Sequence, residues 1–153
     1  MIEALVYIGL LLVVFTVGYA ALYRCADNTV AMRRSAEDIS CCLYAGERWR
    51  ADVRVADGPP RLETTDTEQI LHLPAGTRGE FAYRFSESAV FRRVGSSPWS
   101  LLLTNVVAST MGSEPRQKVS AWKWELELRP RLKTTRIRPL FTFKAVSGQN
   151  LPK

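Results

Sequence analysis

The chain begins with an unbroken apolar run at residues 4–23, ALVYIGLLLVVFTVGYAALY, which contains no charged side chain. A helix rises about 1.5 Å per residue, so about 20 such residues match the hydrocarbon thickness of a bilayer. A secretory signal peptide usually has a basic start and a shorter apolar core, whereas Lys and Arg are absent before this run. The pattern therefore predicts a membrane-spanning helix.

Beyond the apolar run the hydrophobic pattern keeps the period of a helix. Residues 27–55 contain no proline and only one glycine, Gly46. Apolar side chains recur there at a spacing of three or four, opposite a side rich in Arg, Glu and Asp. This stripe consists of Met32, Ala36, Ile39, Leu43 and Val53. We expect one continuous helix with a transmembrane half (1–24) and an amphipathic half (25–56) whose stripe packs on the rest of the chain.

The period changes after Asp57-Gly58-Pro59-Pro60, a sequence that ends a helix. Apolar and polar side chains then alternate with the period of a strand. About seven strands are predicted from this pattern, at residues 61–65, 68–73, 80–85, 89–94, 100–107, 118–128 and 140–146. The predicted fold class is α+β, with the long N-terminal helix packed on one small antiparallel β-sheet domain (57–153).

The formal net charge of +6 could indicate nucleic acid or an anionic surface as a partner. The basic residues are scattered, however, and the densest runs, at 48–54 and 129–138, alternate with apolar or acidic residues. Phosphate contacts by the 129–138 strip are conceivable in DNA uptake, but nothing distinguishes it from a charged edge. We interpret both runs as solvated faces and do not expect nucleic acid as a partner.

The chain has three cysteines, Cys25, Cys41 and Cys42, and one histidine, His72. A structural zinc site needs about four Cys or His ligands at suitable spacing, which this chain cannot supply alone. The odd number also argues against a disulfide framework. We interpret the cysteines as small apolar helix residues, with acylation or an intermolecular bridge conceivable only at Cys25, just past the apolar run.

Nothing in the sequence has the pattern of a catalytic site. It contains no glycine-rich phosphate loop and no serine nucleophile elbow. The acid pairs Glu37/Asp38 and Glu125/Glu127 fit solvated faces of a helix and a strand. We therefore expect no enzymatic activity, no cofactor, no metal and no small-molecule substrate.

Glu3 is the only charged residue before the apolar run. An acid is favourable in the first turn of a helix, where free amide groups and the helix dipole present positive charge. The alternative is that Glu3 enters the bilayer and needs a partner charge, because an unpaired carboxylate in lipid is costly. On the other side of the run follow Arg24, Arg33 and Arg34, which the positive-inside rule would place in the cytoplasm.

The opening residues 1–8, MIEALVYI, resemble the start of mature type IV pilins and type II secretion pseudopilins, in which an acidic residue precedes about twenty apolar residues. Glu3 falls at the acidic position of that family. The later pattern, with RWRADVR at 48–54, strand pairs, Phe91-Arg92-Arg93 and an apolar strand from Leu101, is similar to the minor pseudopilins of the J type.

The resemblance implies a pilin-like structural subunit of a filament in a type II secretion or type IV pilus system. Its partners would be other pilin-like subunits, packed helix to helix, and the lipid of the bacterial inner membrane. The protein would cross that membrane once, with its C-terminal domain in the periplasm. Glu3 would be the subunit-assembly residue, paired with the N-terminal amine of a neighbour, since opposite charges attract strongly in a low-dielectric helix bundle.

Precursors of that family carry a short basic leader ending in Gly, cut before a Phe, and neither precedes Glu3 in this sequence. We expect either a reading frame that starts upstream of Met1 or a protein that does not meet the prepilin peptidase. The alternative function is a single-span membrane-tethered binding module unrelated to filaments. Its recognition residues would be Trp99, Trp122 and Trp124, although alternating tryptophans more often pack on a sheet face.

Overall fold

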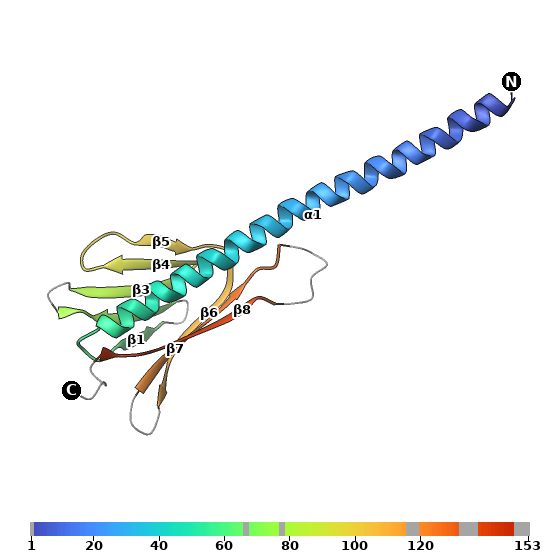
Figure 1. Cartoon of the computed structure of the whole chain (residues 1–153). Coiled ribbons are helices and arrows are strands. Elements are labelled where there is room, and N and C mark those ends of the chain that lie inside the picture. The colour runs from blue at the N-terminus through green and yellow to red at the C-terminus, as the bar shows by residue number, and fades with distance from the viewer. Residues whose placement is uncertain (1, 66–67, 77–78, 116–119, 132–137, 149–153) are drawn as a thin grey trace.

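A computed structural model describes residues 2–65, 68–76, 79–115, 120–131 and 138–148 of the chain (Figure 1). The helix α1 runs without a break from Ile2 to Val55, 54 residues, which corresponds to about 80 Å. It ends immediately before the predicted Asp57-Gly58 break, and the last turn is closed by the bond from Ala56 N to Asp52 O at 3.1 Å. The prediction of one continuous helix is confirmed.

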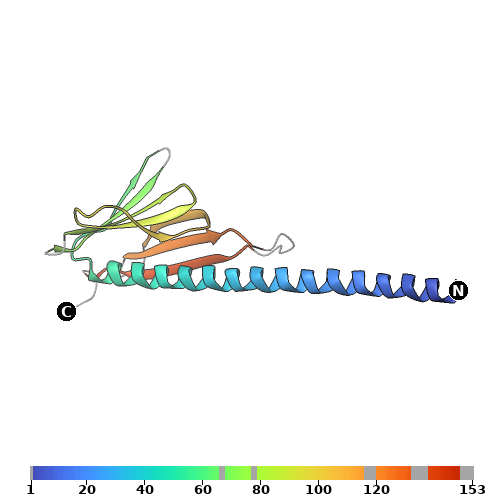
Figure 2. The same cartoon turned by 90° about the horizontal axis from the view of Figure 1, so that it is seen from above.

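The rest of the described chain forms two antiparallel sheets. In the first sheet five strands pair in sequence order, β1 (Arg61–Thr64), β2 (Gln69–Pro74), β3 (Glu80–Ser86), β4 (Ala89–Val94) and β5 (Ser100–Leu103). In the second sheet three strands do so, β6 (Val106–Pro115), β7 (Ser120–Leu128) and β8 (Leu140–Val146). The second half of α1 lies along these sheets, and the first half projects beyond them (Figure 2). The α+β fold class, a long helix on a small antiparallel domain, is confirmed, with two sheets in place of one.

The division into two sheets occurs where the sequence predicted a single strand at 100–107. The chain instead leaves β5 at Leu103 and enters β6 at Val106, because Asn105 adopts a left-handed conformation with φ 63°. Asparagine tolerates this conformation better than most residues. Its side-chain Nδ2 also donates to Asp38 Oδ2 at 2.8 Å and to Arg129 O at 3.0 Å. Asn105 therefore turns the chain from one sheet into the other.

The core lies between α1 and the two sheets and centres on an aromatic cluster. The ring of Trp124 on β7 is 5.7 Å from that of Trp49 on α1, 5.9 Å from Phe143 on β8 and 6.0 Å from Tyr83 on β3. The predicted alternation on β7 places Trp122, Trp124, Leu126 and Leu128 in this core. Residues 118–119 of that predicted strand lie outside the described residues. The core thus joins both sheets to the same face of the helix.

Candidate functional site on the helix

The first half of α1 lies clear of both sheets (Figures 1 and 2). Every large apolar side chain from Ile2 to Tyr23 is 56–80% exposed. The hydroxyl of Thr16 is bonded within the helix, from Oγ1 to Val13 O at 2.8 Å. The helix is long and apolar enough to cross a membrane. So much exposed apolar surface is strongly unfavourable in water.

Glu3 lies in the first turn of this exposed half. Among the described residues, no cationic side chain pairs with it. The first turn of α1 is the end of the helix that lies farthest from the β domain (Figure 2). This position is compatible with either role considered for it, at the membrane surface or opposite a charge on another molecule.

The predicted stripe on the second half was wrong in all but its last member. Val53 is fully buried, whereas Met32 is 66% exposed and Leu43 48% exposed. Ala36 is exposed, and Ile39, 40% exposed, borders the sheet only at the pocket described below. At about 100° per residue, the predicted row is turned by roughly one residue from the face that meets the sheets. These apolar side chains instead form an exposed row beside the docked face.

Small residues and one tryptophan set the actual orientation of the helix. The buried face consists of Cys42, Ala45, Gly46, Trp49, Asp52 and Val53. At Gly46 the ring of Phe143 lies against the helix backbone, and a Cβ there would be 2.1 Å from Phe143 Cε1. This face packs on the sheets because Gly46 allows close approach and because Trp49 inserts into the aromatic cluster. It does so although it is less apolar than the adjacent face that carries the predicted stripe.

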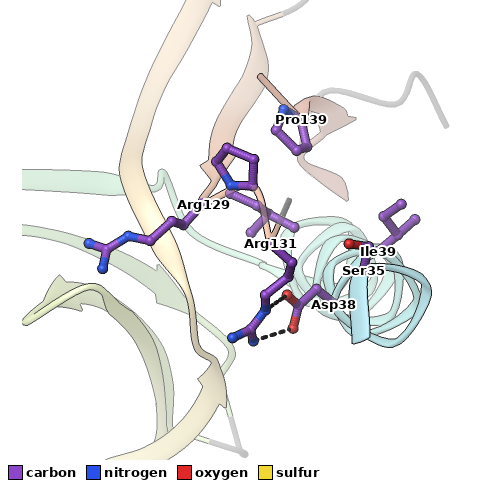
Figure 3. Close-up of a pocket in the computed structure, with 8 residues that line it drawn as sticks. Ser35, Asp38, Ile39, Arg129, Arg131 and Pro139 are labelled. Atoms are coloured by element: carbon purple, nitrogen blue, oxygen red, sulfur yellow. Dashed lines mark hydrogen bonds and ion pairs between the residues drawn. The ribbon is translucent and has the colours of Figure 1, made fainter. Parts of the chain in front are cut away.

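An ionic clamp holds the helix at the end of the domain nearest the apolar half. Figure 3 shows the guanidinium of Arg131 facing the carboxylate of Asp38, with bonds of 2.7 Å (Nε to Oδ2) and 3.0 Å (Nη2 to Oδ1). Asn105 donates to the same Oδ2 atom. Beside this clamp lies a small apolar pocket of about 40 Å³, lined in part by Ile39, Leu128 and Pro139. The clamp fixes where the helix leaves the domain.

A second ionic contact holds the other end of the helix. Asp52 Oδ2 accepts bonds from Tyr83 Oη at 2.6 Å and from Arg92 Nε at 2.7 Å. Burial, and then the charge of Asp52, raises the pKa of Tyr83 well above its ordinary value. Burial lowers the pKa of Arg92, but bonding to Asp52 outweighs this and the pKa lies above its ordinary value. The Tyr83 hydroxyl therefore remains a donor and the Arg92 guanidinium a cation.

The sequence did not indicate either contact. Asp38 and Asp52 had looked like solvated helix acids, because their partners are 93 and 40 residues away in the sequence. The only available signal was their spacing. Both lie seven residues, about two turns, from Ala45, on the face that the tryptophan at position 49 also occupies.

The three tryptophans considered as recognition residues are only in part accessible. Trp122 is 7% exposed and Trp124 is fully buried, so neither can serve as a surface contact. Trp99 is half-buried on the outer side of the first sheet. Two guanidinium groups cover its ring, with Arg84 Cζ at 4.9 Å and Arg93 Cζ at 4.8 Å from the centroid.

The cysteines lie in two different environments. Cys25 and Cys41 are exposed on the helix, and Cys42 is buried against the sheets. Burial, and to a smaller extent the neighbouring Cys41, raises the pKa of Cys42 to about 12. Cys42 is therefore a packing residue, as predicted, and the two exposed thiols are accessible to reagents.

Comparisons with protein-family models, with curated proteins and with solved structures found no match to this chain. The class of protein is therefore defined by its own features. It is an α+β protein whose single long helix has one half clamped on a small β domain and another half apolar enough to span a membrane.

Proposed function

We propose that this protein is a pilin-like minor subunit of a type II secretion or type IV pilus-like filament, without enzymatic activity. It would cross the bacterial inner membrane once and carry its β domain in the periplasm. It would assemble by packing the apolar half of α1 against the helices of other pilin-like subunits, with Glu3 paired to a charge on a neighbour.

The main support for the proposal is that α1 has two different halves. The first half lies clear of both sheets, and the second half is held against them (Figure 2). Up to Tyr23 every large apolar side chain is exposed, whereas from Cys42 onward one face is buried on the sheets. The clamps at Asp38 and Asp52 fix the helix to the domain. A rigid rod of this kind supports stacking of subunits, because the direction of the apolar half is set by the domain.

The position of Glu3 supports a role in setting how the helices of neighbouring subunits align along their length. A carboxylate surrounded by apolar helices is costly unless a cation lies close to it. The only other described charged residues in α1 before residue 33 are Arg24 and Asp27, which lie beyond the apolar run. Registers that leave Glu3 without a cationic partner would therefore be disfavoured, and one paired register would be selected.

The test compares Glu3→Leu with the wild type in cells that produce the pilin-like subunits of the same genome. We expect both proteins in the membrane fraction, because the apolar run is intact, and a several-fold loss of the variant from sheared filaments and from complexes with those subunits. Glu37→Leu is the matched control, since it removes an exposed acid from the same helix. Equal recovery of Glu3→Leu and wild type would contradict the charge pairing, and absence of wild type from all filament fractions would contradict the filament role.

Orientation is tested separately by protease treatment of spheroplasts. Arg24, Arg33 and Arg34 after the apolar run would favour a cytoplasmic domain, whereas filament assembly requires a periplasmic one. We expect the β domain to be digested from outside. Protection of the domain until the membrane is permeabilised would favour a single-span tethered module as the function. Of the three tryptophans considered as its recognition residues, only Trp99 retains an accessible surface.

A further inference from the structure

An open cleft of about 330 Å³ lies between the last turns of α1 and the first sheet, away from the apolar half of the helix. The helix contributes one wall and strands β3 and β4 contribute the other. Its lining residues are Arg48, Ala51, Asp52, Val55, Phe81, Arg92 and Val94. The cleft thus combines two guanidinium groups and one carboxylate with an otherwise apolar surface.

The guanidinium of Arg92 is only partly satisfied by the protein. Its side chain is 10% exposed and lies over the ring of Phe81, with Cζ 5.0 Å from the centroid. Within the described part of the chain, its single hydrogen bond to a protein acceptor is from Nε to Asp52 Oδ2. That oxygen also accepts the bond from Tyr83. A buried guanidinium has five donors, so its terminal amino groups can still bind an anionic oxygen in the cleft.

Arg48 adds a second positive charge at the rim. It precedes Asp52 by four residues and therefore lies on the same side of the helix. Arg48 is exposed, and no carboxylate among the described residues pairs with it. Two cations against the single anion Asp52 leave the cleft with one net positive charge.

We propose that this cleft binds a carboxylate group of a partner polypeptide together with an adjacent aliphatic side chain. The carboxylate lies between Arg48 and Arg92, and the aliphatic group packs on Phe81 and on Val55, which is 49% exposed. Charge complementarity selects the anion, and the apolar walls exclude a bare inorganic anion as the preferred ligand. The site goes beyond filament assembly, because none of its residues belongs to the apolar half of α1.

The probes are short peptides added to the full-length protein in detergent micelles, with binding followed by NMR shifts of the Ala51 and Val55 amides. Ac-Glu-Leu-NH2 supplies a side-chain carboxylate, Ac-Ala-Leu with a free C-terminus supplies an α-carboxylate, and Ac-Gln-Leu-NH2 is the uncharged control. We expect saturable shifts with at least one of the two anionic peptides and not with the control. Whichever peptide binds more tightly identifies the source of the carboxylate.

Three variants complete the test. Arg48→Gln lies at the exposed rim and should weaken binding by about threefold to tenfold, as expected for loss of one charge-assisted contact. Arg54→Gln removes an exposed arginine from the same helix outside the cleft and should leave binding unchanged. Arg92→Lys keeps the charge beside Asp52 but loses the planar donor group, and should also weaken binding. Equal binding of the uncharged peptide, an unaffected Arg48→Gln variant, or no shifts with either anionic peptide would overturn the proposal.

Discussion

The side-chain amide of Gln69 bonds to both backbone groups of Met111. Gln69 Nε2 donates to Met111 O at 3.2 Å, and Met111 N donates to Gln69 Oε1 at 2.9 Å. Gln69 begins β2 in the first sheet, and Met111 lies in β6 at the edge of the second. The amide therefore takes the place of a neighbouring strand and connects the two sheets.

Replacing Gln69 with Leu should destabilise the domain. Both bonds are lost, and the backbone of Met111, a residue only 2% exposed, is left without partners, at a cost of about 1–3 kcal/mol. Urea denaturation of the full chain in detergent, followed by tryptophan fluorescence, measures the change. Thr110→Val, at the exposed neighbouring position of β6, is the control and should change the unfolding free energy by less than about 0.5 kcal/mol.

Gly46→Ala should also destabilise the domain, although alanine is the better helix former. The new Cβ would lie 2.1 Å from Cε1 of the buried Phe143 ring. Overpacking of this kind costs about 1–3 kcal/mol, which exceeds the gain of about 1 kcal/mol in helix propensity. Gly18→Ala is the matched helical control, because nothing lies within 4 Å of its added Cβ. Combining Gly46→Ala with Phe143→Leu should restore part of the loss, and no restoration would contradict the steric explanation.

Period and turn residues predicted the helix and most of the strands of this fold, but not the part of β6 from residue 108 to Pro115. The change of period at Asp57-Gly58 predicted the end of α1, and the alternation along β7 predicted the buried side of Trp122 and Trp124. Both signals are local, because they depend on which side chains share a face of one element. The break between β5 and β6 at Asn105 was not predicted. The pattern of apolar residues is the same whether the chain stays in one sheet or passes from one sheet into another.

The rotation of the helix on the sheets was not predictable from apolar residues alone. Met32 and Leu43 suggested one face, but close packing of Phe143 on Gly46 and the pairing of Asp52 with Arg92 selected another. These contacts join segments far apart in the sequence. Their energy depends on geometry that a hydrophobic pattern does not contain.

The buried thiol of Cys42 predicts a loss of stability at alkaline pH. Its pKa in the folded protein, about 12, lies above the ordinary value of 9.0. Below pH 9 neither state ionises, so the contribution is fully present. Above pH 9 the unfolded thiol loses its proton and the folded one does not, so the unfolding free energy falls by up to about 1.4 kcal/mol per pH unit from this group.

Urea denaturation of wild type and Cys42→Ala between pH 8 and pH 11 measures this slope. The difference in unfolding free energy between the two proteins should shrink as pH rises through the window from 9.0 toward about 12. Cys25→Ala is the control, because Cys25 is exposed, does not contribute to the raised pKa of Cys42, and its removal should leave the slope unchanged. Parallel curves for wild type and Cys42→Ala would show that burial of this thiol does not govern the alkaline loss.

Neutralising Asp38 should loosen the helix where it leaves the domain, whereas neutralising its neighbour Glu37 should not. Asp38 binds Arg131 through two bonds and Asn105 through one, and its side chain is 18% exposed. Among the described residues Glu37 pairs with Arg33 alone, at 3.2 Å, and both side chains are more than half exposed. We expect Asp38→Ala to cost about 1–2 kcal/mol and to speed amide hydrogen exchange around Ile39, and Glu37→Ala to cost less than about 0.5 kcal/mol. A double-mutant cycle of Asp38→Ala with Arg131→Ala should give a coupling of about 0.5–1.5 kcal/mol, and a coupling near zero would mean that the pair does not position the helix.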